Sequence, residues 1–180
     1  MKPELVDPMV WNEIQADIDR DFGAGVTKSL LDNLVPITIG DKEGKSFYLM
    51  PAQWTGLISE DLEDFDIRLV GLWVGTLKKG KLRLSLPILS KLAGVTENII
   101  VVSKQGAELF TYGRSILKEG VVSLKPSLKR GQRVIVQDER GNVIGLAMLV
   151  VDGFMKNRIG REKLVAKNLI DIGWYIRRMG

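Results

Sequence analysis

Hydrophobic residues recur every fourth position near the amino terminus, which predicts a helix with one buried face. The repeating positions are Val10, Ile14, Ile18 and Phe22. Asp7 and Pro8 stand directly before them, and a side-chain acceptor followed by proline is typical of the first turn of a helix. Gly23 follows and favours termination. We therefore expect a helix that begins at Pro8 and ends near Gly23.

The rest of the first half predicts two hairpins and two short helices. The segments VPITI and SFYLM flank the polar turn GDKEGK, and IRLVGLWVGTL and LRLSL flank KKGK. In LRLSL, Leu82, Leu84 and Leu86 alternate with Arg83 and Ser85, which indicates a strand with one solvent-facing side. Short helices are expected over AQWTGLI, after Pro51, and from Pro87 to Ala93.

Strand patterns dominate the second half. The runs IIVVS, GVVSL, QRVIVQD, NVIGLAMLVV and LVAKNL predict strands, with ERG as a tight turn between the third and the fourth. GAELFTYG is typical of a short helix or turn, and DIGWYIRR of a closing helical turn. VDGFMKNRIGREK is polar, basic and glycine-containing, so we expect a loop there.

Charge divides the chain in the same place as the pattern. Residues 1–100 carry 11 Lys and Arg against 15 Asp and Glu, a net charge of −4, whereas residues 101–180 carry 15 against 7, a net charge of +8. We expect two domains, residues 1–96 and 97–180, the second suited to a polyanion such as RNA. A basic solvated surface without a partner is the plainer alternative.

Composition excludes several kinds of chemistry. The chain has no cysteine and no histidine, which excludes disulfides, the usual zinc sites and the Ser-His-Asp and Cys-His nucleophile systems. No apolar run approaches the roughly 20 residues that span a bilayer, and the acidic, helical amino terminus is not typical of a signal peptide. We expect no catalytic residues, no cofactor, no metal and no membrane association.

Two motifs resemble ligand sites without meeting their requirements. Gly40, Gly44, Lys45 and Ser46 nearly form a phosphate-binding loop, but three residues separate the glycines where four are needed, and a strand follows instead of a helix. The acidic run at 60–66 matches no calcium loop. It is more typical of a solvated face or of a surface that attracts a basic protein.

Basic and aromatic residues of the second half are the candidate RNA ligands. Arg114 and Lys118 lie in LFTYGRSILKEG, in which Leu109, Ile116 and Leu117 are expected to anchor the stretch to the core. A second basic set comprises Lys156, Arg158, Arg161, Lys163 and Lys167. Strand alternation would place Lys167 on the same face as Val165. The nearby aromatic residues are Phe110, Tyr112, Phe154, Trp174 and Tyr175. Burial is the commoner role for each, with Tyr112 and Trp174 the better candidates for stacking on bases.

Three segments of the second half resemble a PUA domain, the RNA-binding module named for pseudouridine synthases and archaeosine transglycosylases. The likeness is carried by LFTYGRSILKEG, by the strand containing GLAM and by DIGWYIRR. Among PUA proteins the chain most resembles the Nip-seven family of ribosome biogenesis factors. The resemblance extends more weakly to LVGLWVGTLKKGKLRLSLPILSKLA in the first half.

This resemblance implies an α+β fold, with an amino-terminal α/β domain built on a mainly antiparallel sheet and a carboxyl-terminal PUA pseudo-barrel of mixed strands. It implies a non-catalytic factor that binds RNA and pre-ribosomal or RNA-processing proteins during maturation of the large subunit. An archaeal, cytoplasmic protein is expected, or a nucleolar one in a eukaryote. The residues that match the family's RNA-contacting regions are Tyr112, Gly113, Arg114 and Lys118, together with Lys156 to Lys163.

Two other functions remain open from the sequence. An RNA-modifying enzyme, or its accessory subunit, would use the PUA domain to deliver transfer or ribosomal RNA. Its carboxylates would come from the 60–66 run or from the set Glu13, Asp17, Asp19 and Asp21. A scaffold would instead dock a protein on its acidic half, which is compatible with RNA binding by the other.

Overall fold

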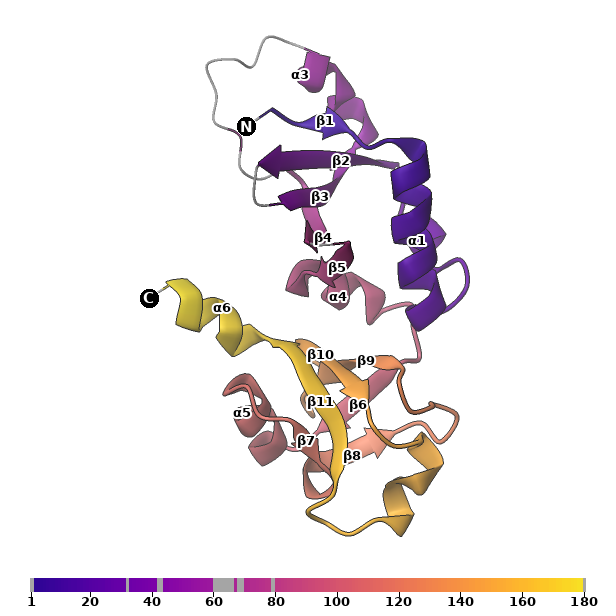
Figure 1. Ribbon diagram of the computed structural model, residues 1–180, viewed down its shortest axis with the longest axis vertical. Coiled ribbons are helices and arrows are strands. Elements are labelled where there is room, and N and C mark those ends of the chain that lie inside the picture. The colour runs from indigo at the N-terminus through magenta and orange to yellow at the C-terminus, as the bar shows by residue number, and fades with distance from the viewer. Residues whose placement is uncertain are drawn as a thin grey trace. The chain divides into compact units, whose positions relative to one another are not determined.

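The computed structural model describes residues 2–31, 33–41, 44–59, 67, 70–78 and 80–179. The chain divides into two compact units, Met1–Lys91 and Leu92–Gly180. Each unit contains its own β-sheet (Figure 1). Each also has its own cluster of buried apolar side chains. The two units are therefore described separately.

The first unit is built on an antiparallel sheet with the strand order β1-β2-β3-β4-β5. Its strands are β1 (Glu4–Leu5), β2 (Leu34–Asp41), β3 (Gly44–Pro51), β4 (Leu72–Lys78) and β5 (Lys81–Leu84). Its helices are α1 (Pro8–Phe22), α2 (Val26–Leu30), the 3₁₀ helix η1 (Ala52–Trp54), α3 (Thr55–Ser59) and α4 (Leu86–Leu92). Both predicted hairpins are confirmed, whereas β1 and α2 are too short to carry a periodic pattern.

Helix α1 begins and buries its apolar face as its sequence predicts. The Asp7 carboxylate accepts a hydrogen bond from the backbone N–H of Met9 at 2.8 Å, which satisfies one of the free amides of the first turn. Its buried side chains are Trp11, Ile14, Ile18 and Phe22.

The strand predicted over LRLSL is shorter than expected. It ends at Leu84, and Ser85 is buried rather than solvent-facing. The Ser85 hydroxyl accepts a hydrogen bond from the N–H of Ile88 at 3.3 Å, so this serine caps α4. Ser85 lies between the end of β5 and the start of α4, so strand alternation does not predict its burial.

The near match to a phosphate-binding loop is a hairpin tip, as predicted. Asp41 pairs with Gly44 across the hairpin, and the strand β3 runs on from Gly44 to Pro51. Backbone amides at a helix N-terminus, which would hold a phosphate, are thus missing from this position. The acidic run at 60–66 lies outside the described residues.

The second unit contains a mixed sheet with the strand order β7-β11-β10-β9-β6-β8. Its strands are β6 (Ile99–Val102), β7 (Ile116–Leu117), β8 (Val121–Leu124), β9 (Arg133–Gln137), β10 (Val143–Leu149) and β11 (Leu164–Asp171). The helices are α5 (Lys104–Thr111), α6 (Ile172–Met179) and the 3₁₀ helices η2 (Lys118–Gly120) and η3 (Gly153–Arg158). Pairing is antiparallel except between β6 and β9, which run parallel.

This sheet closes almost completely on itself. Its two edge strands, β7 and β8, are consecutive in the chain, and only the three residues of η2 join them. A connection that short brings the two edges of the sheet together, which makes a pseudo-barrel. Its interior is filled by apolar side chains that include Ile100, Phe110, Val134 and Leu149. The predicted fold class, α+β with an antiparallel sheet followed by a mixed pseudo-barrel, is confirmed.

The DIGWYIRR segment fastens the end of the chain to α5. The Asp171 carboxylate is buried, accepts a hydrogen bond from the N–H of Trp174 at 2.8 Å and pairs with Arg177 at 3.1 Å. Arg177 also donates to the carbonyl oxygen of Thr111 at 2.7 Å. Gly173 lies against the same carbonyl so closely that a Cβ there would stand 2.0 Å from its oxygen. Helix α6 therefore holds the last turn of α5 in place.

Candidate nucleic-acid interface

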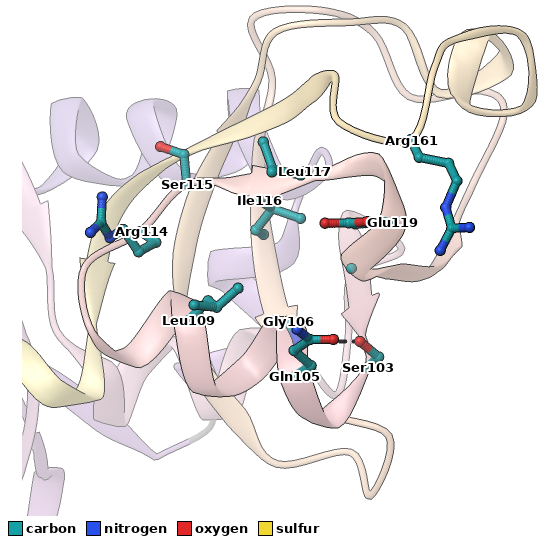
Figure 2. Close-up of a pocket in the computed structure, with 11 residues that line it drawn as sticks. Ser103, Gln105, Gly106, Leu109, Arg114, Ser115, Ile116, Leu117, Glu119 and Arg161 are labelled. Atoms are coloured by element: carbon teal, nitrogen blue, oxygen red, sulfur yellow. Dashed lines mark hydrogen bonds between the residues drawn. The ribbon is translucent and has the colours of Figure 1, made fainter.

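A groove of about 460 Å³ lies between α5, β7 and η2 in the second unit. Ten of its lining residues are labelled in Figure 2, where Arg114 and Arg161 stand at opposite ends. Leu109 and Ile116 lie between these two arginines, and Ser103 and Gln105 lie toward the start of α5. The groove thus combines an apolar centre with a cation at each end, a composition suited to a ligand that has both an apolar face and negative charge.

The stretch LFTYGRSILKEG forms one wall of this groove because it changes direction sharply. Helix α5 begins at the cap Ser103, whose hydroxyl accepts from the N–H of Gly106 at 3.2 Å. The helix ends at Thr111 with Tyr112 as its C-cap. Gly113 then adopts a φ of +85°, and its N–H donates to the carbonyl of Phe110. Since φ in this range favours glycine, Gly113 allows the chain to turn back into β7. Phe110, 1% exposed, anchors the turn in the core.

Gly106 and Gly120 let α5 approach η2 closely. A Cβ on Gly106 would lie 2.9 Å from the carbonyl oxygen of Gly120. Gly120 itself has no positive φ. Its role is to permit close packing at the floor of the groove rather than to supply a bend.

Backbone pairing joins the two basic sets that are far apart in the sequence. The N–H of Lys118 donates to the carbonyl of Lys163 at 2.9 Å, and the N–H of Glu119 donates to that of Arg161 at 3.0 Å. These bonds continue the β7–β11 ladder into η2. They hold Arg161 at the groove beside residues that precede it by about 40 positions.

Lys156 has a structural partner on β8, the strand that follows η2. Its ammonium group donates to the carbonyl oxygen of Val122 at 2.8 Å, on the edge strand β8. Partial burial lowers the pKa of Lys156 below its usual value, and the neighbouring charge of Lys118 lowers this pKa further.

Lys167 is exposed, but not where strand alternation predicts. Val165 and Ala166 are both fully buried, so Val165 and Lys167 face opposite environments. The pairing of β11 with β7 contains a register irregularity between Leu164 and Ala166, which breaks the period of two. Lys167 does not line the groove.

Only some of the remaining predicted side chains take the role expected of them. Leu109 is 46% exposed and lines the groove instead of anchoring the core, a part that Ile116 takes. Tyr112 is 78% exposed beside Gly113, in keeping with its prediction as the more open aromatic. Trp174 is partly buried, and the Tyr175 side chain lies outside the described residues. Arg158 is exposed on η3, a 3₁₀ helix within the predicted loop.

The polar lining of the groove was missed by sequence reasoning. Ser103, Gln105, Ser115 and Glu119 are ordinary surface residue types, and no spacing in the sequence marks them as a group. The one sequence signal for Glu119 is its position in LFTYGRSILKEG, directly after the predicted RNA ligand Lys118. These four side chains add hydrogen-bonding groups of both kinds to the two arginines.

One carboxylate considered for catalysis has a structural role. Asp19 accepts hydrogen bonds from the N–H of Gly25 at 3.0 Å, the N–H of Thr27 at 2.8 Å and the Thr27 hydroxyl at 2.7 Å. We expect Asp19→Ala to lower the free energy of unfolding by about 2 kcal/mol, because the buried Thr27 loses its acceptor. Glu13→Ala, an exposed change on the same helix, should stay within about 0.5 kcal/mol. Urea unfolding of both variants measures this, and equal losses would contradict the assignment.

The described part of the chain offers neither a membrane-spanning helix nor a cluster of metal ligands. No described helix is long and apolar enough to cross a membrane. No group of three or more described Asp and Glu side chains is placed to hold a metal ion.

Residues 98–180 match the model of the family described as the UPF0113 PUA domain. The second unit therefore contains a PUA domain, a class of domain that binds RNA. A segment of 67 residues, 37% of this chain, is 40% identical to part of glutamate 5-kinase from Aquifex aeolicus. The matched segment spans only 18% of that enzyme's length.

Solved structures share the fold over nearly the whole chain. A hypothetical protein from the hyperthermophilic archaeon Pyrococcus horikoshii has a TM-score of 0.64 at 16% identity, with 97% of this chain and 98% of that one covered. A conserved PUA domain protein from Thermoplasma acidophilum has a TM-score of 0.62 at 14% identity, with 99% of each chain covered. At such low identity the likeness concerns the fold alone.

Proposed function

We propose that this chain is a non-catalytic RNA-binding protein that acts in the maturation of large-subunit ribosomal RNA. The observation that carries the RNA-binding part is the backbone pairing of Lys118 and Glu119 with Lys163 and Arg161. It brings Arg161 to the groove that Arg114 also lines, within the residues that match the PUA domain model. A solvated basic surface would not need such an arrangement.

The side chains of the groove match the chemical groups of a nucleotide in single-stranded RNA. Arg114 and Arg161 are exposed at the groove. In the proposed complex they contact phosphate oxygens, which would give affinity without sequence preference. Leu109 offers apolar contact to a base or a sugar. Gln105 and Glu119 present a hydrogen-bond donor and acceptors that can discriminate between base edges.

The ribosomal assignment rests on the resemblance of LFTYGRSILKEG and DIGWYIRR to the Nip-seven family. The acidic first half, net −4, supports a role in docking a basic RNA-processing protein while the second half holds RNA. The absence of histidine and cysteine from the chain removes the commonest general base and thiol nucleophile, which supports a binding role without turnover.

Titration of the full chain with fluorescent single-stranded RNA at several salt concentrations tests RNA binding. We expect log affinity to fall linearly with log salt, with a slope of about −0.7 for each phosphate contacted. Four contacts would give a slope of about −2.8. An affinity that is undetectable at low salt, or insensitive to salt, would contradict the proposal.

Cross-linking in cells followed by sequencing of the bound RNA tests the ribosomal assignment. Precursor ribosomal RNA of the large subunit should be enriched over transfer RNA. Enrichment of transfer RNA, or chemical change in RNA incubated with the purified chain, would favour an RNA-modifying enzyme or its accessory subunit.

A further inference from the structure

The 3₁₀ helix η3 presents an aromatic ring to solvent between two cations. Phe154 is 44% exposed, although its sequence context predicts burial as its commoner role. The Lys129 ammonium nitrogen lies 5.3 Å from the centre of the ring, and the Arg158 guanidinium carbon lies 5.9 Å from it. None of these three residues lines the groove beside α5.

The position of this ring is set by the backbone on which it stands. The N–H of Gly153 donates to the carbonyl of Leu128 at 2.8 Å, and a Cβ on Gly153 would lie 2.1 Å from the carbonyl oxygen of Lys125. The Asp152 carboxylate accepts from the N–H of Arg130 at 2.9 Å. The start of η3 is thereby fastened to the turn before β9. Phe154 is held in place without needing to bury its ring.

The cations at this ring are available to a ligand. Within the part of the chain that the structure describes, Lys129 and Arg158 form no ion pair, and both are exposed. Lys125 of the same turn differs, since it pairs with Glu97 at 2.6 Å. Asp152 is the acidic neighbour, and its carboxylate is engaged by the backbone of Arg130.

We propose that Phe154 is a base-stacking residue for single-stranded RNA, with Lys129 and Arg158 as phosphate contacts on either side of the stacked nucleotide. This site rests on the proposed function and extends it to a second surface of the PUA domain. A nucleotide within a strand matches the cluster because its base has a flat apolar face and a phosphate lies on either side of its sugar. An acidic peptide would satisfy the cations and leave the ring without a partner.

Replacing a cation on the Phe154 ring by a stacked base is favourable. An exposed cation–π contact corresponds to a factor of about 2 to 5 in an equilibrium constant. Stacking of a base on an aromatic side chain corresponds to a factor of about 5 to 150 in an equilibrium constant. A base that displaces one cation from the ring therefore gains more than it removes, and the released cation can pair with a phosphate.

A double-mutant cycle on the full chain separates stacking from charge. The affinities of the original chain, Phe154→Ala and Phe154→Leu are measured for a uridine oligomer and for an abasic oligomer of equal length and charge. We expect both variants to bind the uridine oligomer about 5- to 150-fold more weakly and the abasic oligomer with unchanged affinity. Phe154→Trp, which keeps an aromatic face, should retain binding of the uridine oligomer.

Other outcomes overturn the inference in distinguishable ways. Equal weakening for both oligomers, or none for either, excludes base stacking at Phe154 while RNA binding by the chain stands. No RNA binding by the original chain removes the proposed function itself. Tighter binding of a polyglutamate peptide than of RNA would reassign the cluster to an acidic protein. Thermal unfolding of Phe154→Leu provides the folding control, because leucine keeps most of the apolar volume.

Discussion

Gly145→Ala is expected to lower the free energy of unfolding by about 4 kcal/mol or more. Gly145 lies in β10, where a Cβ would stand 2.1 Å from the carbonyl oxygen of Ile170 in β11 and 2.7 Å from the ring of Phe110. A backbone carbonyl cannot move without breaking the β10–β11 ladder, and Phe110 cannot move without shifting α5. Because α5 forms a wall of the groove, RNA affinity should fall along with stability.

Gly131→Ala is the matched control for this change. Gly131 has a φ of +88°, and a Cβ at this position would have no other atom within 4 Å. Its substitution should cost only about 1–2 kcal/mol, the penalty of the left-handed backbone conformation. Urea unfolding of the two variants gives the comparison. If Gly145→Ala lowers the free energy of unfolding no more than Gly131→Ala does, then β10 and β11 accommodate a Cβ at this position, and the prediction is wrong.

The double variant Arg114→Ala with Arg161→Ala is expected to weaken single-stranded RNA binding about 25-fold at roughly 0.1 M salt. Each phosphate contact on a single strand contributes about 0.7 to the salt slope, which corresponds to about 5-fold at this salt concentration. The slope of log affinity against log salt should become shallower by about 1.4. Both arginines are exposed, so stability should change little.

Lys81→Ala with Arg83→Ala controls for net charge, since it also removes two cations. Both residues are exposed on β5 of the first unit. The slope should then stay unchanged, because these cations are not expected to contact phosphates. Equal losses in the two double variants would mean that total charge, rather than the groove, determines RNA affinity.

Local patterns in the sequence determined most of the elements of this fold. The four-residue period from Val10 to Phe22 and the cap at Asp7 depend on residues within one helix, so they can be recognised without the rest of the chain. The same holds for the hairpin at Gly40 and Gly44, where a strand follows the turn. The basic character of the second half is likewise a property of composition, and it indicates a polyanion such as RNA without any knowledge of the site.

Only the tertiary structure decided which residues form the groove and the ring cluster. Glu119 meets Arg161 through backbone pairing that continues the β7–β11 ladder, and Lys129 meets Phe154 because Gly153 packs against a distant turn. The exposure of Leu109 and the break in alternation at Val165 have the same origin. Burial of a side chain depends on neighbours brought together by chain closure, whereas helix and strand periodicity depends on neighbours in sequence.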